Sequence, residues 1–282
     1  MIARTIALAG ANGYTGQIFA KELLKQGLEL RILARDESIG SAALQEFMTN
    51  GASIHAISYD DEASLVKALQ GADVLISTVS GAALVSAQIP LIKAAKRAQV
   101  KLFVPSEYAG PYKDESSPFA QLRKTVFDAV QDVGLPCAVL SNGGFPERCL
   151  TPTFGYDFAE RKVTLWGDGN SKVSWTTARS VGDWIANVLK TIPIGLLQDK
   201  HFCIQGKIST ANEIIDLWQK KYGAKLQVDY RPMKELDDRI EADKDGFLAP
   251  ILKELYSGGV EVGGKDNSLY PDWEPESLEA IL

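Results

Sequence analysis

The first 141 residues alternate between short apolar runs and stretches with helical periodicity. The apolar runs predict strands at 5–10, 29–34, 53–57, 73–78, 101–105 and 136–141. Apolar residues at three- and four-residue spacing predict helices at 15–26, 41–50, 61–70, 84–99 and 117–133. Pro90 lies inside one of these helices and predicts either a kink or a helix start there. Repeated strand–helix units indicate a parallel sheet covered by helices on both faces, so the predicted fold class is α/β and doubly wound.

The regular alternation ends near residue 150. Later strands are predicted at 162–166, 173–177, 201–205 and 226–230, and helices at 180–191, 209–222, 233–242, 247–256 and 274–282. Thr210 and Glu213 have the spacing of a capping box, which marks a helix start. We expect 1–150 to form one domain to which 171–206 returns. The remaining segments, 151–170 and 207–282, are expected to form a smaller, mostly helical part.

Three glycines follow the first predicted strand directly and precede the first predicted helix. Gly10, Gly13 and Gly16 have the spacing G-x-x-G-x-x-G. Such a turn presents free backbone N–H groups and the positive end of a helix dipole to one point, which favours a phosphate. Gly-rich turns also occur where a chain merely reverses. The position between strand and helix favours a Rossmann-type dinucleotide site, with Asn12, Tyr14 and Thr15 as its other turn residues.

Arg35 ends the second predicted strand, where an NAD-binding site would present an acidic residue to the ribose. A guanidinium at this position is suited to a 2′-phosphate instead. An exposed arginine paired with Asp36 or Glu37 is the alternative interpretation. We therefore expect the cofactor to be NADP(H).

Other polar and glycine residues follow the later strands of the predicted sheet. Ligands of open parallel sheets bind at the carboxyl ends of the strands, so these residues are candidates for one site. The cofactor candidates are Thr78, Ser80, Gly81, Pro105 and Ser106. The substrate candidates are Glu107, Tyr108, Asn142, Gly143, Gly144 and Phe145. Ordinary turn chemistry also accounts for the group after the fourth strand, and loop ordering is the favoured role of the Glu107 carboxylate.

Composition excludes several other classes of protein. The net charge is −6 and Lys and Arg form no basic stripe, so we expect no direct nucleic-acid binding. Cys137, Cys149 and Cys203 lack C-x-x-C spacing, which favours a reducing compartment, and we expect a cytoplasmic protein. His55 and His201 have no metal-ligand spacing, so no metal is expected. No apolar run approaches the roughly 18 residues that cross a bilayer, and we expect no membrane contact.

Together, these motifs resemble the NmrA-like, isoflavone-reductase-like branch of the atypical short-chain dehydrogenases. The resemblance runs nearly end to end, and its most specific stretch is Phe-Val-Pro-Ser-Glu at 103–107. The segments that carry it are 10–16, 76–81, Gln88 with 91–95, 103–108, 167–170 and 269–273. The resemblance implies an NADP-binding domain at 1–150 and a C-terminal part that closes over a small-molecule substrate.

Two kinds of protein occur in this branch. Its reductases transfer a hydride from NADPH to aromatic or phenylpropanoid-like compounds, and we expect this activity here. Other members keep the cofactor site, lack evident catalysis and act as redox-sensing regulators through a protein partner. That second role is the alternative, because the Tyr-x-x-x-Lys pair of ordinary short-chain dehydrogenases is absent from the expected helix.

The resemblance also places a catalytic lysine on the helix after the fifth strand. Counting back from Gly134 puts that position on Arg123, with Lys124 one residue later. We expect Lys124 to be the proton donor, because a neighbouring cation and desolvation lower the pKa of a lysine, whereas an arginine only stabilises an oxyanion. Tyr108 is the reserve donor. An exposed surface position is the alternative interpretation of Lys124.

Overall fold

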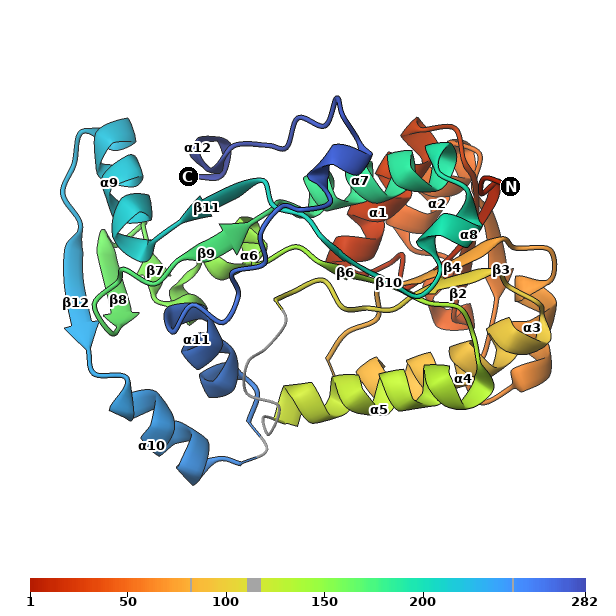
Figure 1. Cartoon of the computed structure of the whole chain (residues 1–282), viewed down its shortest axis with the longest axis horizontal. Helices are drawn as coiled ribbons and strands as arrows, with labels where there is room; N and C mark the ends of the chain where they lie inside the picture. The colour runs from red at the N-terminus through yellow and green to blue at the C-terminus, as the bar shows by residue number, and fades with distance from the viewer. Residues whose placement is uncertain (82, 111–117, 245) are drawn as a thin grey trace.

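A parallel five-stranded sheet forms the centre of the protein (Figure 1). The computed structural model describes residues 1–81, 83–110, 118–244 and 246–282. The strand order is β3-β2-β1-β4-β5, with every neighbouring pair parallel. The strands are β1 (Thr5–Ala9), β2 (Glu29–Ala34), β3 (Ser53–Ala56), β4 (Val74–Ser77) and β5 (Leu102–Val104). This order is that of a Rossmann-type sheet, so the predicted fold class is confirmed.

Two further strands continue this sheet beyond β5. The Phe103 N–H donates to the Pro136 carbonyl over 2.8 Å, and Phe103 pairs in parallel with Cys137 just before β6 (Ala138–Ser141). Strand β10 (Lys200–Cys203) then pairs in parallel with β6. The chain therefore comes back to the first sheet long after residue 150.

Helices cover both faces of the sheet because its strand residues alternate between two cores. Ile6 and Leu8 belong to the core under α1 (Tyr14–Lys25), α2 (Ala42–Thr49) and α7 (Ala178–Thr191). Ala7 and Ala9 belong to the core under α3 (Glu62–Leu69), α4 (Ala83–Arg97) and α5 (Pro118–Val133). Each fully buried large apolar side chain in these cores stabilises the fold by about 1.5–3 kcal/mol.

Helix α4 corrects one prediction, because it begins at Ala83 and runs continuously through Pro90. A helix start at Pro90 is therefore wrong. Proline removes one helical hydrogen bond, but Leu91 and Ile92 directly after it are fully buried against the sheet. Their packing holds the helix across the proline.

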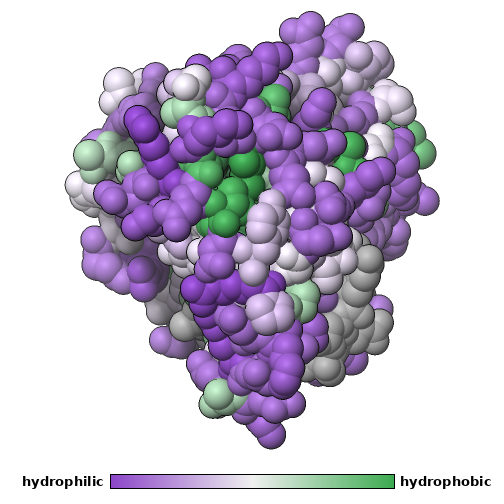
Figure 2. Space-filling model, turned by 90° about the vertical axis from the view of Figure 1, so that its left-hand side faces the viewer, coloured by the Kyte–Doolittle hydropathy of each residue, from purple (hydrophilic) through white to green (hydrophobic). Residues whose placement is uncertain are grey.

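Residues 146–175 and 207–282, called the second part of the chain below, have a core of their own, which includes Trp166, Trp218 and Tyr256. Its strands are β7 (Tyr156–Asp157), β8 (Lys162–Trp166) and β12 (Gln227–Arg231), with β8 in the middle, and the antiparallel pair β9 (Val173–Trp175) and β11 (Lys207–Ser209). Its helices are α6 (Pro146–Cys149), α9 (Ala211–Tyr222), α10 (Lys234–Ala242), α11 (Leu248–Tyr256) and α12 (Leu278–Ile281), while α8 (Ile194–Leu197) follows α7. Figure 2 shows hydrophilic residues over most of the face of this part, with hydrophobic ones gathered in a small central area.

Two sequence predictions about this second part had different outcomes. The capping box is confirmed, since the Thr210 hydroxyl and the Glu213 carboxylate each accept the other residue's backbone N–H. The helix predicted at 274–282 is wrong in its first half, because only 278–281 is helical. The Trp273 indole N–H donates to the Ser180 carbonyl of α7 and the Glu276 backbone N–H donates to the Ser180 hydroxyl, and these contacts hold the preceding segment outside a helix.

Candidate cofactor and active site

The Gly-rich turn after β1 leaves no room for a side chain at Gly10 or Gly16. Gly10 has φ of +86°, and a Cβ there would lie 2.8 Å from Thr78. A Cβ on Gly16 would lie 2.1 Å from the Gly10 carbonyl oxygen. Gly13 precedes α1 as its N-cap without a side-chain cap, and its own N–H donates to that same carbonyl. The turn therefore brings backbone close to the sheet and keeps N–H groups of the first turn of α1 open to an anion.

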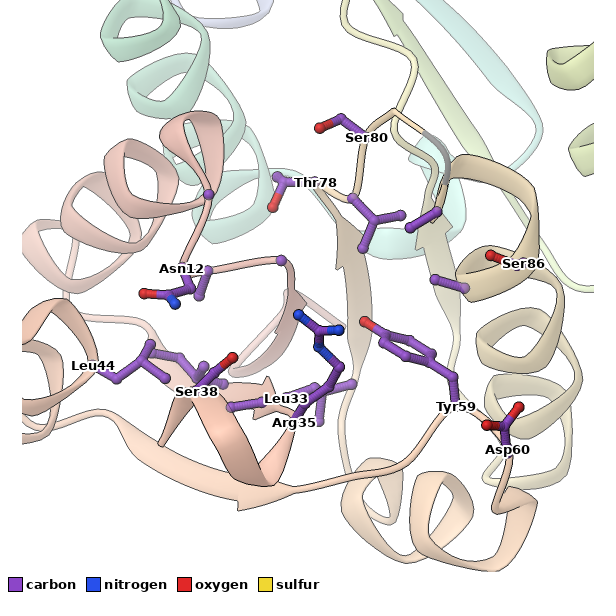
Figure 3. Close-up of a pocket in the computed structure, with 18 residues that line it drawn as sticks. Asn12, Leu33, Arg35, Ser38, Leu44, Tyr59, Asp60, Thr78, Ser80 and Ser86 are labelled. Carbon is purple, nitrogen blue, oxygen red and sulfur yellow. The ribbon is translucent and has the colours of Figure 1, made fainter. Parts of the chain in front are cut away.

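A pocket of about 550 Å³ opens beside this turn at the carboxyl ends of the strands (Figure 3). Its volume falls within the range of small-molecule sites. The lining comes from the Gly-rich turn, the end of β2, the loop after β3, the loop after β4 and the start of α4. The lining residues are Gly10, Ala11, Asn12, Gly13, Ile32, Leu33, Ala34, Arg35, Ser38, Leu44, Tyr59, Asp60, Thr78, Val79, Ser80, Ala83, Ser86 and Ala87.

Arg35 lies in this pocket and also forms an exposed ion pair. Figure 3 shows its guanidinium beside the ring of Tyr59. Its Nη1 lies 3.2 Å from Glu37 Oε1, and both side chains are mostly exposed. The structure thus shows the exposed pair that the alternative interpretation described, formed with Glu37, and it places Arg35 in the lining of the pocket.

The other predicted cofactor residues of this rim lie at turns. Thr78 is buried and donates through Oγ1 to the Ala9 carbonyl over 2.8 Å, which ties the end of β4 to β1. Asn12 accepts from the Ser41 hydroxyl over 2.9 Å, which joins the Gly-rich turn to α2. Ser80 is exposed in the pocket, and Gly81 has φ of +62° before α4. Tyr14, Thr15 and Gly16 form the first turn of α1 outside the pocket lining.

Gln88, which belongs to the segments that carry the family resemblance but was not among the predicted site residues, holds the loop after β5. It is fully buried in α4, and its Oε1 accepts the Ser106 backbone N–H over 2.9 Å, next to buried Pro105. A polar residue on an otherwise apolar helix face was the available signal. Tyr59 and Ser38 were also missed, since neither stands directly at the end of a predicted strand.

Glu107 and Arg123 form a buried ion pair between the loop after β5 and helix α5. Their exposed fractions are 2% and 8%, and Arg123 Nε donates to Glu107 Oε2. Arg123 also donates to the Gly110 carbonyl over 3.3 Å. Burial raises the pKa of Glu107 to about 7, although the Arg123 charge opposes this shift. The other carboxylate oxygen, Oε1, is buried and has no hydrogen-bond partner in the described part of the chain.

The structure does not bring Lys124 to this pair. Its side chain is 64% exposed and its Nζ lies 2.6 Å from Asp128 Oδ2, one helical turn along α5. A one-residue step on a helix turns a side chain by about 100°, which separates Lys124 from the direction of Arg123.

Tyr108 has a structural role, because both its hydroxyl and its ring contact residues of the first domain. Its hydroxyl donates to the Ser77 carbonyl over 3.0 Å, and its ring packs edge-on against Phe19 at a centroid distance of 4.9 Å. Burial, and then the charge of Glu107, raise the pKa of Tyr108 far above its usual range. In this geometry the hydroxyl anchors the loop after β5 to β4.

The segment after β6 forms a packed junction with β9. Asn142 is fully buried, and a Cβ on Gly143, whose φ is +75°, would lie 2.0 Å from the Ser174 carbonyl oxygen. The Gly144 N–H donates to that oxygen over 2.8 Å. Phe145 packs against the core under α1 and α7. The structure thus brings these predicted substrate residues to the strand ends, where their backbone joins the two parts of the chain.

Two further features of the described residues bear on ligands. No helix among them is both long and apolar enough to span a bilayer. No group of three or more His, Cys, Asp and Glu residues in these ranges has a geometry that could hold a metal ion. The thiols of Cys137, Cys149 and Cys203 are all free.

Comparisons with known proteins agree with this architecture. The profile of the NmrA-like family matches residues 3–264. The chain is 30% identical over 247 residues to phenylcoumaran benzylic ether reductase PT1 of Pinus taeda, covering 82% of this chain and 79% of that protein. It is 28% identical to the bifunctional pinoresinol-lariciresinol reductase of Linum usitatissimum, covering 98% and 97%. The chain therefore belongs to the NmrA-like family, as the sequence motifs predicted.

Solved structures show the same fold. The structure titled AtPrR2 with NADP+ and (+)pinoresinol superposes with a TM-score of 0.84 at 24% identity, covering 100% of this chain and 98% of that one. A crystal structure of isoflavone reductase gives a TM-score of 0.83 at 22% identity, covering 98% and 97%. At these identities the likeness establishes the architecture.

Proposed function

We propose that this protein is an NADPH-dependent reductase of a small aromatic, phenylpropanoid-like substrate. The observation that carries the proposal is the close-packed glycine turn from Gly10 to Gly16 beside a 550 Å³ pocket at the strand ends. This arrangement fits a dinucleotide, because a Cβ at Gly10 would collide with Thr78 and a Cβ at Gly16 with the Gly10 carbonyl, so only glycines allow the turn to approach the sheet this closely. Membership of a family that includes named phenylpropanoid reductases supports the reaction class.

Different residues at the pocket would bind different groups of the cofactor. The turn at Gly13 and the N-terminus of α1 would hold the pyrophosphate, and Arg35 would hold the 2′-phosphate. Thr78 and Ser80 would line the path toward the nicotinamide. When bound, NADPH supplies a hydride to the substrate.

Arg123 is the group that we assign to the substrate's developing negative charge. A buried guanidinium stabilises an oxyanion strongly, because little water screens it. Glu107 is its positioning residue, since the ion pair fixes the direction of the guanidinium at the end of β5. Lys124, which the sequence favoured as the donor, pairs with Asp128 at the surface instead. Tyr108 remains a reserve donor whose hydroxyl would first have to leave Ser77.

The alternative function, a cofactor-sensing regulator, is supported by the positions of Arg123 and Lys124. Lys124 is paired to Asp128 at the surface, and Arg123 is paired to Glu107, so neither position offers a free lysine to the pocket. A cofactor-sensing regulator with a protein partner would fit the same pocket. This alternative requires NADP(H) binding without turnover.

The two functions are separated by incubating the purified protein with NADPH and a panel of phenylcoumarans, furofuran lignans, isoflavones, quinones and aldehydes. Substrate-dependent loss of NADPH absorbance for an aromatic member supports the reductase. Tight NADPH binding without oxidation above background across the panel would favour the regulator.

A further inference from the structure

An arginine from the second part of the chain lies over the first residue of α1. The ring of Tyr14 is 44% exposed, and the Arg148 guanidinium carbon lies 5.3 Å from its centroid. Tyr14 follows Gly13 directly, so this contact stands at the N-terminus that faces the predicted pyrophosphate. A cation over an aromatic face is attracted by the negative charge density of the ring face. The Tyr14 ring therefore helps to hold the Arg148 guanidinium near the N-terminus of α1.

The neighbouring residues hold α6, the helix that carries Arg148, in place. Glu147 Oε1 accepts the Ala178 N–H over 2.6 Å at the start of α7, and α7 packs along α1. Pro146 is buried beside them. Burial, followed by the charge of Glu147, raises the pKa of Tyr14 to about 12, so its hydroxyl stays neutral at physiological pH.

Apart from its contact with Tyr14, the Arg148 side chain has no evident structural role among the described residues. Its side chain is exposed, and it takes part in none of the ion pairs between described residues. The first turn of α1 contains no acidic residue, so nothing in that turn competes for the guanidinium. An anion at this helix end would meet the helix dipole and free N–H groups from one direction and the arginine from another.

We propose that Arg148 is a phosphate-binding residue that contacts the cofactor pyrophosphate, whereas Arg35 takes the 2′-phosphate. The proposal rests on the proposed function, because it concerns the same cofactor. It adds a ligand from outside the first 145 residues, so that cofactor binding links α6 to the Gly-rich turn. The guanidinium suits this task because its planar fork of donors matches two phosphate oxygens at once.

The test compares the dissociation constants of three ligands by isothermal titration calorimetry, which needs no turnover. NADP+ carries both phosphate groups, ADP-ribose carries only the pyrophosphate, and 2′-AMP carries only the 2′-phosphate. Loss of a charged hydrogen bond corresponds to roughly tenfold or more in affinity. We expect Arg148→Ala to weaken NADP+ and ADP-ribose by about this factor and to leave 2′-AMP unchanged. Arg35→Ala, the matched control, should weaken NADP+ and 2′-AMP and spare ADP-ribose.

A further variant tests the charge itself. Arg148→Lys keeps the positive charge but lacks the fork of donors, so it should recover part of the NADP+ affinity that Arg148→Ala loses. If folded Arg148→Ala binds ADP-ribose as tightly as the wild type, or weakens all three ligands equally, the assignment is overturned. If the wild-type protein binds none of the three, the proposed function itself fails, which is a different result from an unaffected Arg148 variant.

Discussion

Arg123 and Glu107 are joined across the end of β5 with almost no exposed surface, while the residue after Arg123 points into solvent. Breaking a buried pair by removing one partner leaves an uncompensated charge and costs about 3–5 kcal/mol. An exposed pair such as that of Lys124 with Asp128 is worth about 0–1 kcal/mol. The two neighbours on α5 therefore have different consequences for stability and catalysis.

The first prediction concerns turnover. We expect Arg123→Lys to lower kcat by roughly 10²-fold, because an ammonium lacks the fork that binds Glu107 and an oxyanion together. Lys124→Ala should keep kcat within about twofold, since it loses only an exposed pair. Both are measured from steady-state NADPH oxidation, with circular dichroism to check folding. Normal turnover of Arg123→Lys together with a large loss in Lys124→Ala would return the donor role to Lys124.

The second prediction concerns pH. The pKa of Glu107 rises from 4.5 in the unfolded chain to about 7 in the fold. Between these values the folded state keeps a proton that the unfolded state has lost, so the free energy of unfolding should fall as pH rises from about 4.5 to about 7. Glu107→Gln removes this contribution. Urea denaturation of both proteins across the window checks it, and equal pH slopes would contradict the raised pKa.

The third prediction concerns cofactor choice. Arg35→Ala should weaken NADPH binding by about 1.5–3 kcal/mol and leave NADH nearly unchanged, because only NADPH has the 2′-phosphate. Glu37→Gln, which frees the guanidinium from its exposed partner, should tighten NADPH by up to about 1 kcal/mol. Fluorescence titration measures both, and equal losses for the two cofactors in Arg35→Ala would refute the assignment.

The fourth prediction uses two glycines with the same backbone angle. Gly143 and Gly27 both have φ of +75°, but only Gly143 has a neighbour, the Ser174 carbonyl, in the place of a Cβ. Gly27→Ala should cost about 1 kcal/mol for the left-handed conformation alone. Gly143→Ala should cost about 3 kcal/mol or more, because the junction with β9 must also move. Thermal unfolding of both variants gives the comparison, and similar losses would mean that the junction yields easily.

Much of the fold was predictable because the hydrophobic period is strong where the elements are long. The predicted helix at 180–191 corresponds to α7 at 178–191, and the strand at 29–34 matches β2. Elements such as α6, α8 and β7 have at most four residues, too few to show a period, and were not predicted. The residues before α12 are not helical because they bind α7, a contact that no local sequence pattern predicts.

The candidate site was predictable only as far as strand ends define it. The Gly-rich turn, Arg35 and Thr78 follow from their places after strands, and the pocket contains them. The choice between Arg123 and Lys124 depends on a one-residue rotation and on a partner in another loop. The position of Arg148 was not predictable either, because its contact with Tyr14 joins segments that are far apart in the sequence.

The proposed reaction is hydride transfer from NADPH to an aromatic substrate. The most direct test uses NADPH deuterated at the nicotinamide carbon that gives the hydride, the phenylpropanoid panel, and mass spectrometry of the products. We predict one deuterium on a reduced carbon of an aromatic product, in amount equal to the NADPH consumed, and a roughly hundredfold slower appearance of that product in Arg123→Lys. Tight NADPH binding with no deuterium in any product would contradict the reductase.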